Sequence, residues 1–397
     1  MTNKQTGNSY LFILILVGIV ASFGPFVTDF YLPALPAMTG YFHTTPSMLQ
    51  LSITFSLIGL AVGQLFIGPL SDMYGRKQML LLSLILFFFS TLGAILAPGV
   101  SLFLAMRLLQ GLFGAGGIVI SKSIATDLYG GKDLARFFSM LSAVQGLAPI
   151  CAPVLGGVLL EWTDWRGIFC ILMGLSTVLI VMLCFFKESL RYERRLKGSV
   201  LSVFGTYKPV VQNGEFMYYV MAQGFSMGTM FTYIAASPFI FQEHYGLSSL
   251  AYSLCFGVNA LAIMVGSFFV MRYRSQRRGL LAGCRLFLGI GVAVAVILLL
   301  NGSILLLEVA LIALLFSLGM ILPTSTTLAL KLERNNSGSA SAILGFMVFL
   351  MGGIASPLAG MGNMIVSTSI LIIFFCILTL ASTLMAYGHK TRALSRA

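Results

Sequence analysis

Two charged side chains stand inside long apolar runs of this sequence, and their charges are complementary. Asp29 lies in the string F-V-T-D-F-Y-L-P, and Arg107 lies in the string R-L-L-Q-G-L-F-G-A-G-G. A charged group among apolar neighbours is costly, by at least about 2.5–3.5 kcal/mol at the centre of a bilayer, so such groups usually have a function. The functional interpretation of Asp29 is a site that binds and releases a proton, with the guanidinium of Arg107 as its partner.

Asp29 and Arg107 are predicted to lie at a similar depth in their apolar runs. Asp29 precedes the end of one run, and Arg107 follows the start of another. With a helical rise of about 1.5 Å per residue, both lie roughly 8–9 Å below the same boundary. We therefore expect the two side chains to make contact. The alternatives are a carboxylate wetted at its helix end and a guanidinium that reaches the interface along its apolar stem.

The composition indicates which elements position these side chains. The chain of 397 residues is 58% hydrophobic and only 9% charged, whereas a soluble domain carries about 25% charged residues. Because a membrane-spanning helix needs roughly 20 apolar residues, we predict an all-α polytopic membrane protein. The twelve candidate spans are about residues 10–34, 47–70, 78–98, 101–127, 135–160, 165–186, 214–242, 249–271, 280–300, 304–330, 338–360 and 365–388.

The basic residues are distributed by side of the membrane. The chain has a formal net charge of +12, and 20 of its 24 lysine and arginine residues fall in the tails or in every second gap between candidate spans. By the positive-inside rule, these gaps and both termini are cytoplasmic. The basic character therefore reflects topology, and we expect no nucleic-acid partner.

No residue cluster in the sequence predicts a metal site or a disulfide framework. The six cysteines lie in or beside apolar runs without a close-spaced pair, and the three histidines lie far apart. Such cysteines are typical of small packing residues. We expect no metal, no cofactor and no enzyme activity, with an integral-membrane enzyme as a remote alternative. The first apolar run is also too long for a cleavable signal peptide.

The longest gap divides the candidate spans into six plus six. We predict an N-terminal six-helix bundle over residues 1–186, a cytoplasmic linker over 187–213 and a C-terminal six-helix bundle over 214–397.

An internal offset of 204 residues indicates that the two halves are related. It aligns Thr28 with Thr232, Gly75 with Gly279, and Pro153 with Pro357. Parallel repeats of this kind are typical of secondary transporters, whose substrate site lies near the membrane midplane between the repeats.

Two further strings combine glycine or proline with polar residues. The string G-P-L-S-D-M-Y-G-R-K at 68–77 stands between two spans, where Asp72 can accept hydrogen bonds from a helix N-terminus and the basic residues face the anionic inner leaflet. Prolines bend the candidate span 135–160. We predict a hinge or seal there, formed by Pro149, Pro153, Gly156 and Gly157.

The candidate residues for a substrate pocket lie on spans one, four and seven. Spans one and seven correspond to each other across the repeat, so their aromatic side chains are favoured over the many other aromatic residues. The candidates are Phe26, Tyr31, Gln110, Tyr233 and Phe239. Glu308, near the start of its span, is expected to be wetted instead.

Together these strings resemble the major facilitator superfamily. Its loop between helices two and three, G-x-L-x-D-x-x-G-R-K, is similar to residues 68–77 through Gly68, Leu70, Asp72, Gly75, Arg76 and Lys77. The helix-four motif of its proton-coupled exporters resembles the string that contains Arg107, Gln110 and Gly111. Its helix-five antiporter motif G-P-x-x-G-G resembles residues 152–157, with Ala152 in place of the usual glycine.

Three other strings narrow the resemblance to one branch of the superfamily. The strings T-D-F-Y-L-P-A-L-P-A-M, T-T-P-S-M-L-Q-L-S and W-R-G-I-F are similar to the bicyclomycin-resistance and chloramphenicol-efflux type. This likeness implies a 12-helix carrier of the bacterial cytoplasmic (inner) membrane that couples inward proton flow to drug export. Asp29 would be the titrating acid, Arg107 its partner, and Asp72 and Arg76 part of an inner gate. The implied partners are protons, lipid and a small-molecule drug, and we expect a monomer.

The substrate class is predicted from the charges inside the first half. Asp29 is the only acid well inside that half, and Arg107 stands ready to neutralise it. A specialised exporter of lipophilic cations would carry a less compensated acid, so we predict neutral or zwitterionic amphipathic compounds such as phenicols or bicyclomycin. Export of a natural metabolite (a sugar, peptide or amino-acid derivative) by the same mechanism, and passive or symport transport, remain open alternatives.

Overall fold

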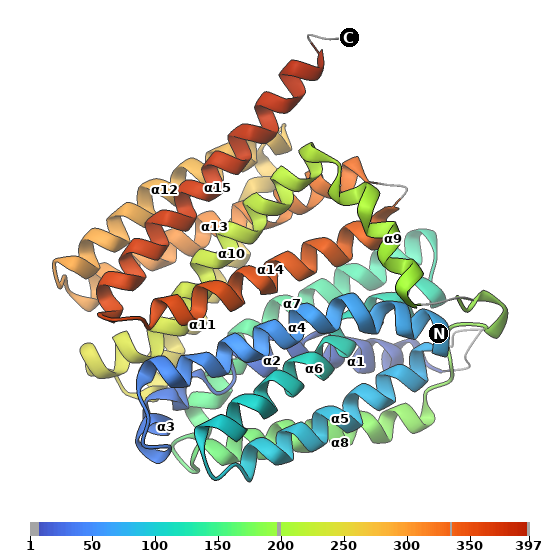
Figure 1. The fold of residues 1–397 in the computed structure, drawn as a ribbon, viewed down its shortest axis with the longest axis horizontal. Helices are drawn as coiled ribbons and strands as arrows, with labels where there is room; N and C mark the ends of the chain where they lie inside the picture. Colours follow the sequence, from blue (N-terminus) through green and yellow to red (C-terminus); the bar gives the residue numbers. More distant parts are fainter. Residues whose placement is uncertain (1–7, 197–199, 334–335, 395–397) are drawn as a thin grey trace. The chain divides into compact units, whose positions relative to one another are not determined.

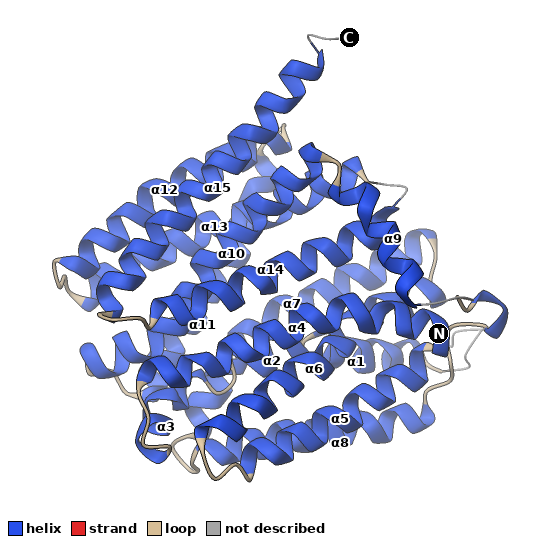
Figure 2. Cartoon of the chain, in the orientation of Figure 1, coloured by secondary structure: helices blue, strands red, loops and turns tan. Residues whose placement is uncertain are grey.

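The computed structural model describes residues 8–196, 200–333 and 336–394, and every regular element in these ranges is helical (Figure 2). The predicted cytoplasmic termini, Met1 and Ala397, lie outside the described residues. Several helices begin at a polar side chain that accepts a hydrogen bond from a free amide of the first turn, which is the expected role of an N-cap residue. These caps are Ser9, Asp164, Asn213, Ser248 and Ser303.

The chain divides into two compact units. The first contains Met1–Thr44 and Phe55–Val203, and the second contains Thr45–Thr54 and Phe204–Ala397. Helix α4 (Pro46–Tyr74) has residues in both units. So does α9 (Val200–Val211), an additional helix that lies inside the predicted linker.

The first unit is built around α6 (Figure 1). Helices α1, α2 and α5 contact α6, and α8 packs on α5. In chain order the elements of this unit are α1 (Tyr10–Ala21), α2 (Phe23–Thr28), η1 (Leu32–Ala34), α3 (Leu35–Tyr41), the rest of α4, α5 (Arg76–Ile95), α6 (Val100–Leu128), α7 (Gly131–Leu159), α8 (Trp165–Phe185) and η2 (Tyr192–Arg194).

The second unit is built around α10, which contacts α13, α14 and α15 (Figure 1). Helices α11 and α12 pack on α13. The elements after α9 are α10 (Gly214–Phe239), the π-helical turn η3 (Ile240–His244), α11 (Ser249–Phe269), η4 (Val270–Arg272), α12 (Gln276–Leu299), α13 (Ile304–Leu332), α14 (Ser337–Ala359) and α15 (Met364–Leu394).

The first predicted span is broken where the sequence analysis expected one continuous helix. Helix α1 ends at Ala21, and the two parts of the span meet at an angle of 41°. Pro25 has no amide hydrogen and cannot donate to the carbonyl of Ala21, which breaks the helical ladder. Gln145 of α7 donates to that carbonyl instead, at 3.3 Å. A second break follows Thr28, the last residue of α2, and Asp29 is the C-cap residue of that helix.

Glycines allow the helices of each unit to cross at close range. A Cβ atom on Gly59 or Gly63 of α4 would overlap the backbone of α6, and one on Gly111 of α6 would overlap the carbonyl of Ser56. In the second unit, Gly266 of α11 and Gly319 of α13 meet each other's helices in the same way. Small residues at such crossings are typical of membrane helix pairs. The matching pairs, α4 with α6 and α11 with α13, support the predicted relation between the halves.

Not every predicted span is apolar enough to be assigned to the membrane by composition. Among the described residues, nine helices are long and apolar enough, and ten if the bent pair at the start counts as one span. The apolar part of α7 is shorter, Val144–Leu159. Helix α10 is not among the nine apolar helices, although most of it is buried. Its many small and hydroxyl-bearing residues, which face other helices, make it less apolar. The count of twelve spans stays a prediction.

Candidate functional site

Asp29 lies at the second break of the first span and is 3% exposed. Its Oδ1 atom is 2.7 Å from the hydroxyl oxygen of Thr28, and that hydroxyl is also 2.9 Å from the carbonyl oxygen of Gly24. A hydroxyl has one hydrogen and donates to one acceptor at a time. If Thr28 donates to Gly24, the carboxyl group of Asp29 must supply the hydrogen of the other bond.

The equivalent threonine of the second unit indicates which acceptor Thr28 takes. Thr232, at the offset of 204 residues, donates to the carbonyl of Gly228 at 2.8 Å. Gly228 in turn corresponds to Gly24. If Thr28 forms the same bond in the first unit, its one hydrogen is used by Gly24, and the contact with Asp29 then requires a protonated carboxyl group. This arrangement suits a carboxyl group that carries a proton while it is buried.

Arg107 of α6 is fully buried and binds neutral partners. Its Nη2 atom donates to the carbonyl oxygen of Val27 at 2.5 Å, and its Nη1 atom donates to Oε1 of Gln110 at 2.6 Å. Its Cζ atom lies 4.3 Å from the ring centroid of Tyr31, within the range of a cation–π interaction. The Nε hydrogen is buried without a hydrogen-bond acceptor among the described residues.

The expected ion pair between Asp29 and Arg107 is not formed in this structure. The ion pairs found in the described part of the chain do not include either residue. Arg107 instead holds the backbone of Val27, two residues before the acid. The similar depth of Asp29 and Arg107 correctly predicted that their two segments lie close together. The carbonyl group that the helix break exposes to the guanidinium has no counterpart in the sequence pattern.

Two of the predicted pocket residues, Tyr31 and Gln110, contact Arg107, and Gln110 extends the hydrogen-bond network. Gln110 donates from Nε2 to the hydroxyl of Thr91 at 2.7 Å, and Thr91 donates to the carbonyl of Phe87. Tyr31 stacks on Arg107, as described above. Phe26 is half-buried, and its ring centroid lies 6.1 Å from that of Phe30. Tyr31 and Gln110, predicted as pocket residues, thus both contact the arginine, and their role in substrate binding stays a prediction.

The predicted hinge residues of α7 meet the same stretch of the first span. A Cβ atom on Gly156 would overlap the carbonyl oxygen of Phe30, the residue after Asp29. Pro153 and Gly157 are buried in the same helix, and Pro149 is half-buried. Gly156 is thus the point where α7 touches the segment that carries the acid.

The loop string at residues 68–77 forms a separate charged network. Arg76 is buried and binds Asp72 at 2.5 Å, Asp127 at 3.0 Å and the hydroxyl of Ser71 at 2.7 Å. Gly75 has a φ of +107°, a backbone conformation that favours glycine. A Cβ atom on Gly68 would meet a methyl group of Val119 at 3.2 Å, a tight contact that requires Val119 to shift slightly.

Asp72 does not cap a helix, contrary to the sequence prediction. Glu188, after the end of α8, accepts hydrogen bonds from the backbone amides of Arg76 and Lys77, both at 3.1 Å. A carboxylate is favoured at this position because the N-terminus of α5 carries a partial positive charge. Lys77 also donates from Nζ to the carbonyl of Cys184 at 3.2 Å. Asp72 is occupied by Arg76, four residues along the chain.

The second unit holds a polar cluster that the sequence analysis missed. Asn259 of α11 donates from Nδ2 to the hydroxyl of Tyr233 at 3.0 Å and to Oε2 of Glu308 at 3.3 Å. Oε1 of Glu308 is buried, so the expectation that this residue is wetted is wrong for that oxygen. An amide in the middle of an apolar span was the available signal, because a buried polar side chain is costly without hydrogen-bond partners.

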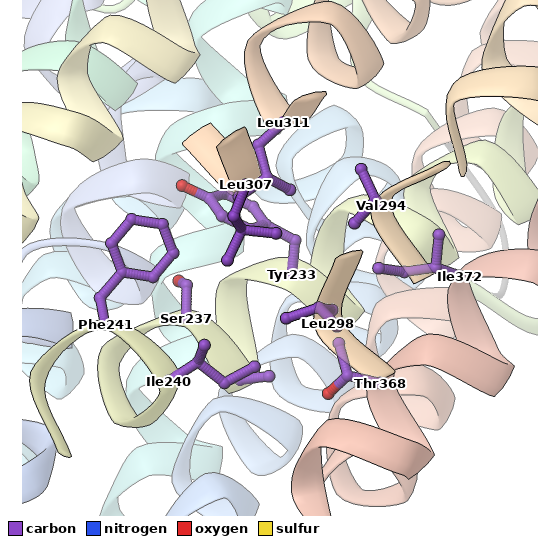
Figure 3. A pocket seen from close by; sticks show the side chains of 11 residues that line it. Tyr233, Ser237, Ile240, Phe241, Val294, Leu298, Leu307, Leu311, Thr368 and Ile372 are labelled. Atoms are coloured by element: carbon purple, nitrogen blue, oxygen red, sulfur yellow. The ribbon is translucent and has the colours of Figure 1, made fainter. Parts of the chain in front are cut away.

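A small pocket with a cavity volume of about 20 Å³ adjoins Tyr233 (Figure 3). Its wall is mainly apolar and includes Ser237, Phe241, Leu307, Leu311 and Thr368. The hydroxyl of Thr368 is buried without a hydrogen-bond partner in the described ranges. Of the two candidates on the seventh span, Tyr233 lines this pocket, and Phe239 is buried without being among its lining residues.

Comparison with known proteins gives the family. A profile of the Major Facilitator Superfamily matches residues 14–357. The chain therefore belongs to that superfamily of transporters, and it is a multi-pass protein of the bacterial cytoplasmic (inner) membrane.

Three relatives are similar over most of their length. The chain is 35% identical to the uncharacterized MFS-type transporter YdgK of Bacillus subtilis (strain 168), over 91% of this chain and 92% of the relative. It is 28% identical to the bicyclomycin resistance protein homolog of Haemophilus influenzae, over 89% and 90%. It is 27% identical to the chloramphenicol resistance protein of Pseudomonas aeruginosa, over 94% and 88%. These relatives confirm the branch of the family that the sequence resembled.

The fold agrees with solved structures of the same superfamily. A bacterial homolog of the human lysosomal transporter Spinster, crystallised in an inward-facing conformation, matches 96% of this chain and 98% of its own with a TM-score of 0.74. The identity is 15%, so this likeness concerns the fold alone.

Proposed function

We propose that this protein exports amphipathic drugs across the bacterial inner membrane in exchange for protons, by alternating access. The bicyclomycin and chloramphenicol resistance proteins among its relatives support drug export. The driving force would be proton re-entry, worth about 2.3 kcal/mol per charge for each 100 mV of membrane potential. Such a carrier would have twelve spans in two six-helix bundles, joined by a cytoplasmic linker, and would act as a monomer without a cofactor.

The observation that carries the proposal is the buried position of Asp29 beside Thr28. The hydrogen-bond arrangement favours a protonated carboxyl group, as argued above from Thr28 and Gly24. An antiporter needs an acid that holds a proton in one state and releases it in another. Asp29 would release it when substrate or the opening of the site changes its surroundings.

Arg107 would stabilise the negative charge that remains on Asp29 after the proton leaves. Its guanidinium is always charged, yet it binds only neutral groups, and its Nε hydrogen is unused among the described residues. The guanidinium donates a hydrogen bond to the carbonyl group of Val27, which precedes Asp29 by two residues in the sequence. This cation is available to an ionised Asp29 or to an electron-rich group of a substrate.

These charges support a neutral or zwitterionic substrate for the first unit. Arg107 offers a positive charge to nitro and carbonyl oxygens, which phenicol-like compounds carry. Tyr31 and Gln110 flank the guanidinium and would contact the same substrate groups.

Two other regions would control the change of access. Arg76 joins the ends of α4, α5 and α6 through Asp72 and Asp127, which suits an inner gate that opens when these bonds break. Gly156 and the prolines of α7 would allow that helix to move against the segment after Asp29.

Drug transport into proteoliposomes tests the function. Purified protein would be reconstituted, and labelled chloramphenicol accumulation would be followed with and without an imposed pH gradient. We expect accumulation that depends on the gradient and is abolished by a protonophore. Sugars, peptides and amino-acid derivatives would be offered as competitors. Accumulation of one of these metabolites, with no transport of chloramphenicol or bicyclomycin, would overturn drug export in favour of the metabolite alternative.

A further inference from the structure

We infer that the exposed face of α12 binds the phosphate group of an anionic phospholipid, through Arg278 and Arg285. This inference goes beyond drug export and does not rest on it, because it concerns how the second unit meets the membrane. It is supported by the position of the two arginines on the helix, by their lack of acidic partners, and by the apolar surface beside them.

The first step is the exposed face of α12. The opposite face of this helix packs on α13 and α15 (Figure 1). The exposed face carries Arg278, Arg285, Gly289, Val292 and Val296. Their spacing of three, four or seven residues places all five on one side of an α-helix. Because α12 is apolar enough to span the membrane, and its exposed face is apolar beyond Arg285, this face meets lipid rather than water.

The second step is the depth of Arg285. Helix α12 ends at Leu299, and a hydrocarbon core of about 30 Å covers roughly 20 residues of helix. Counted back from Leu299, that core begins near residue 280, so the backbone of Arg285 lies inside it. Side chains of an α-helix lean towards its N-terminus, so that of Arg285 leans towards Arg278 and the membrane interface. The long stem lets the charge reach this interface, where lipid phosphate groups lie.

The third step is the lack of acidic partners for these charges. Residues 272–285 include five arginines. The acids from residue 204 onwards are Glu215, Glu243, Glu308 and Glu333. Glu215 is paired with Arg277 at 2.5 Å, and Glu333 accepts hydrogen bonds from two asparagines. The other two acids lie in η3 and near the start of α13, and both of these adjoin the opposite end of α12.

Arg278 and Arg285 therefore need a negative partner from outside the chain. The ion pairs of the described residues include neither of them. Tyr387 of α15 lies within electrostatic range of both arginines, so their charges gather at one part of the surface. A guanidinium binds phosphate oxygens through two parallel N–H donors. The end of α12 that carries them is the predicted cytoplasmic end, where the membrane surface is anionic.

The fourth step is the apolar surface next to Arg285. Gly289 follows one turn later, and a Cβ atom there would meet nothing within 4 Å, so the helix surface is bare at this point. Val292 and Val296 continue the face and are 42% and 46% exposed. An acyl chain can lie along this strip while its phosphate group binds the arginines. A free phosphate ion would leave the strip uncovered, so the geometry favours a phospholipid.

Two lipids with the same acyl chains test this inference by native mass spectrometry of the full-length protein in detergent. Phosphatidylglycerol has a net negative charge on its phosphate, and phosphatidylcholine has the same phosphate with a compensating ammonium group. We expect the first phosphatidylglycerol molecule to bind at least about 10-fold more tightly than the first phosphatidylcholine. We expect Arg285→Gln and Arg278→Gln each to weaken binding of phosphatidylglycerol at least about 10-fold.

Lys331→Gln is the matched control for the loss of one positive charge. Lys331 is exposed, belongs to the same unit and lies at the end of α13. Binding of phosphatidylglycerol to this variant should stay within about twofold of the unchanged protein. All three variants should keep the melting temperature of the unchanged protein in lipid-free detergent, because the replaced side chains are exposed.

Three results would overturn the inference. They are equal binding of the two lipids, unchanged binding of phosphatidylglycerol in both arginine variants, and an equal loss in Lys331→Gln. Inorganic phosphate should displace the lipid no better than sodium chloride of equal ionic strength, and stronger displacement would identify a free anion as the ligand instead. Neither a drug nor a proton gradient is present in these measurements, so a failure of export would appear separately, in the transport assay.

Discussion

Arg107 donates a hydrogen bond to the backbone carbonyl oxygen of Val27 at 2.5 Å, two residues before the acid it was expected to pair with. The contact is possible because α2 ends at Thr28, and its last carbonyl groups lack amide partners within the helix. A guanidinium held by neutral groups keeps its charge available. In this state Asp29 satisfies its hydrogen bond through Thr28, so each group is ready to respond when the other changes charge.

Replacing Arg107 by lysine should strongly reduce export although the charge is kept. Lysine cannot donate to Val27 and Gln110 in a fixed fork, nor stack its plane on Tyr31. We expect at least a tenfold fall in drug transport, about 1.4 kcal/mol or more. Arg274→Lys is the matched control, because Arg274 is exposed. Equal transport by both variants would contradict the assigned role of Arg107.

Adding a methyl group at Gly156 should stop the movement of α7 or displace it. The new Cβ atom would overlap the carbonyl oxygen of Phe30. We expect Gly156→Ala to be expressed and to lose most drug transport in proteoliposomes. Gly146→Ala, on the same helix, meets nothing within 4 Å and should transport normally. Normal transport by Gly156→Ala would show that α7 does not need this close contact.

Gly75→Ala should destabilise the protein, because the backbone there has a φ of +107°. Its Cβ atom would also lie 2.6 Å from Oε2 of Glu188 and 2.7 Å from Nη2 of Arg195. The expected cost is about 1–3 kcal/mol, visible as a lower melting temperature in detergent. Gly174→Ala, in an open position on α8, should leave the melting temperature unchanged or raise it. A melting temperature of Gly75→Ala equal to that of the unchanged protein would refute the strain.

Glu188→Ala should loosen the start of α5. It removes the acceptor for the amides of Arg76 and Lys77, which costs about 1 kcal/mol for a helix cap. Hydrogen exchange followed by mass spectrometry should show roughly fivefold faster exchange at those two amides. The exposed Glu193→Ala serves as the control. If exchange is unchanged in Glu188→Ala, another group holds this helix end.

The helical membrane fold was predictable because composition and charge distribution act over the whole chain. The contacts of individual side chains were not predictable in the same way. Pro25 is a position where a helix break can be expected. Whether the carbonyl group freed by that break would meet Gln145 depends on the packing of helices that are distant in the sequence. Helix α9 was missed because it is a short element with polar neighbours and no long apolar run.

The candidate site was predicted in part, for a similar reason. Asp29, Arg107 and Gln110 stood out as polar residues in apolar runs, and the structure brings their segments together. Asn259 met the same criterion and was overlooked. Glu188 gave no signal, since its role depends on where the chain after α8 returns to the start of α5. Spacing along one helix reveals neighbours on that helix, and contacts between helices depend on packing that spacing does not encode.

The most direct test of the central claim is drug-driven proton release from the purified protein in weakly buffered detergent solution. Adding a transported drug to the unchanged protein should release protons, because substrate binding discharges Asp29. Asp29→Asn should bind the drug and release none, whereas Glu161→Gln, an exposed acid, should behave as the unchanged protein. Proton release from Asp29→Asn equal to that of the unchanged protein would contradict the account, since the proton would then come from another group.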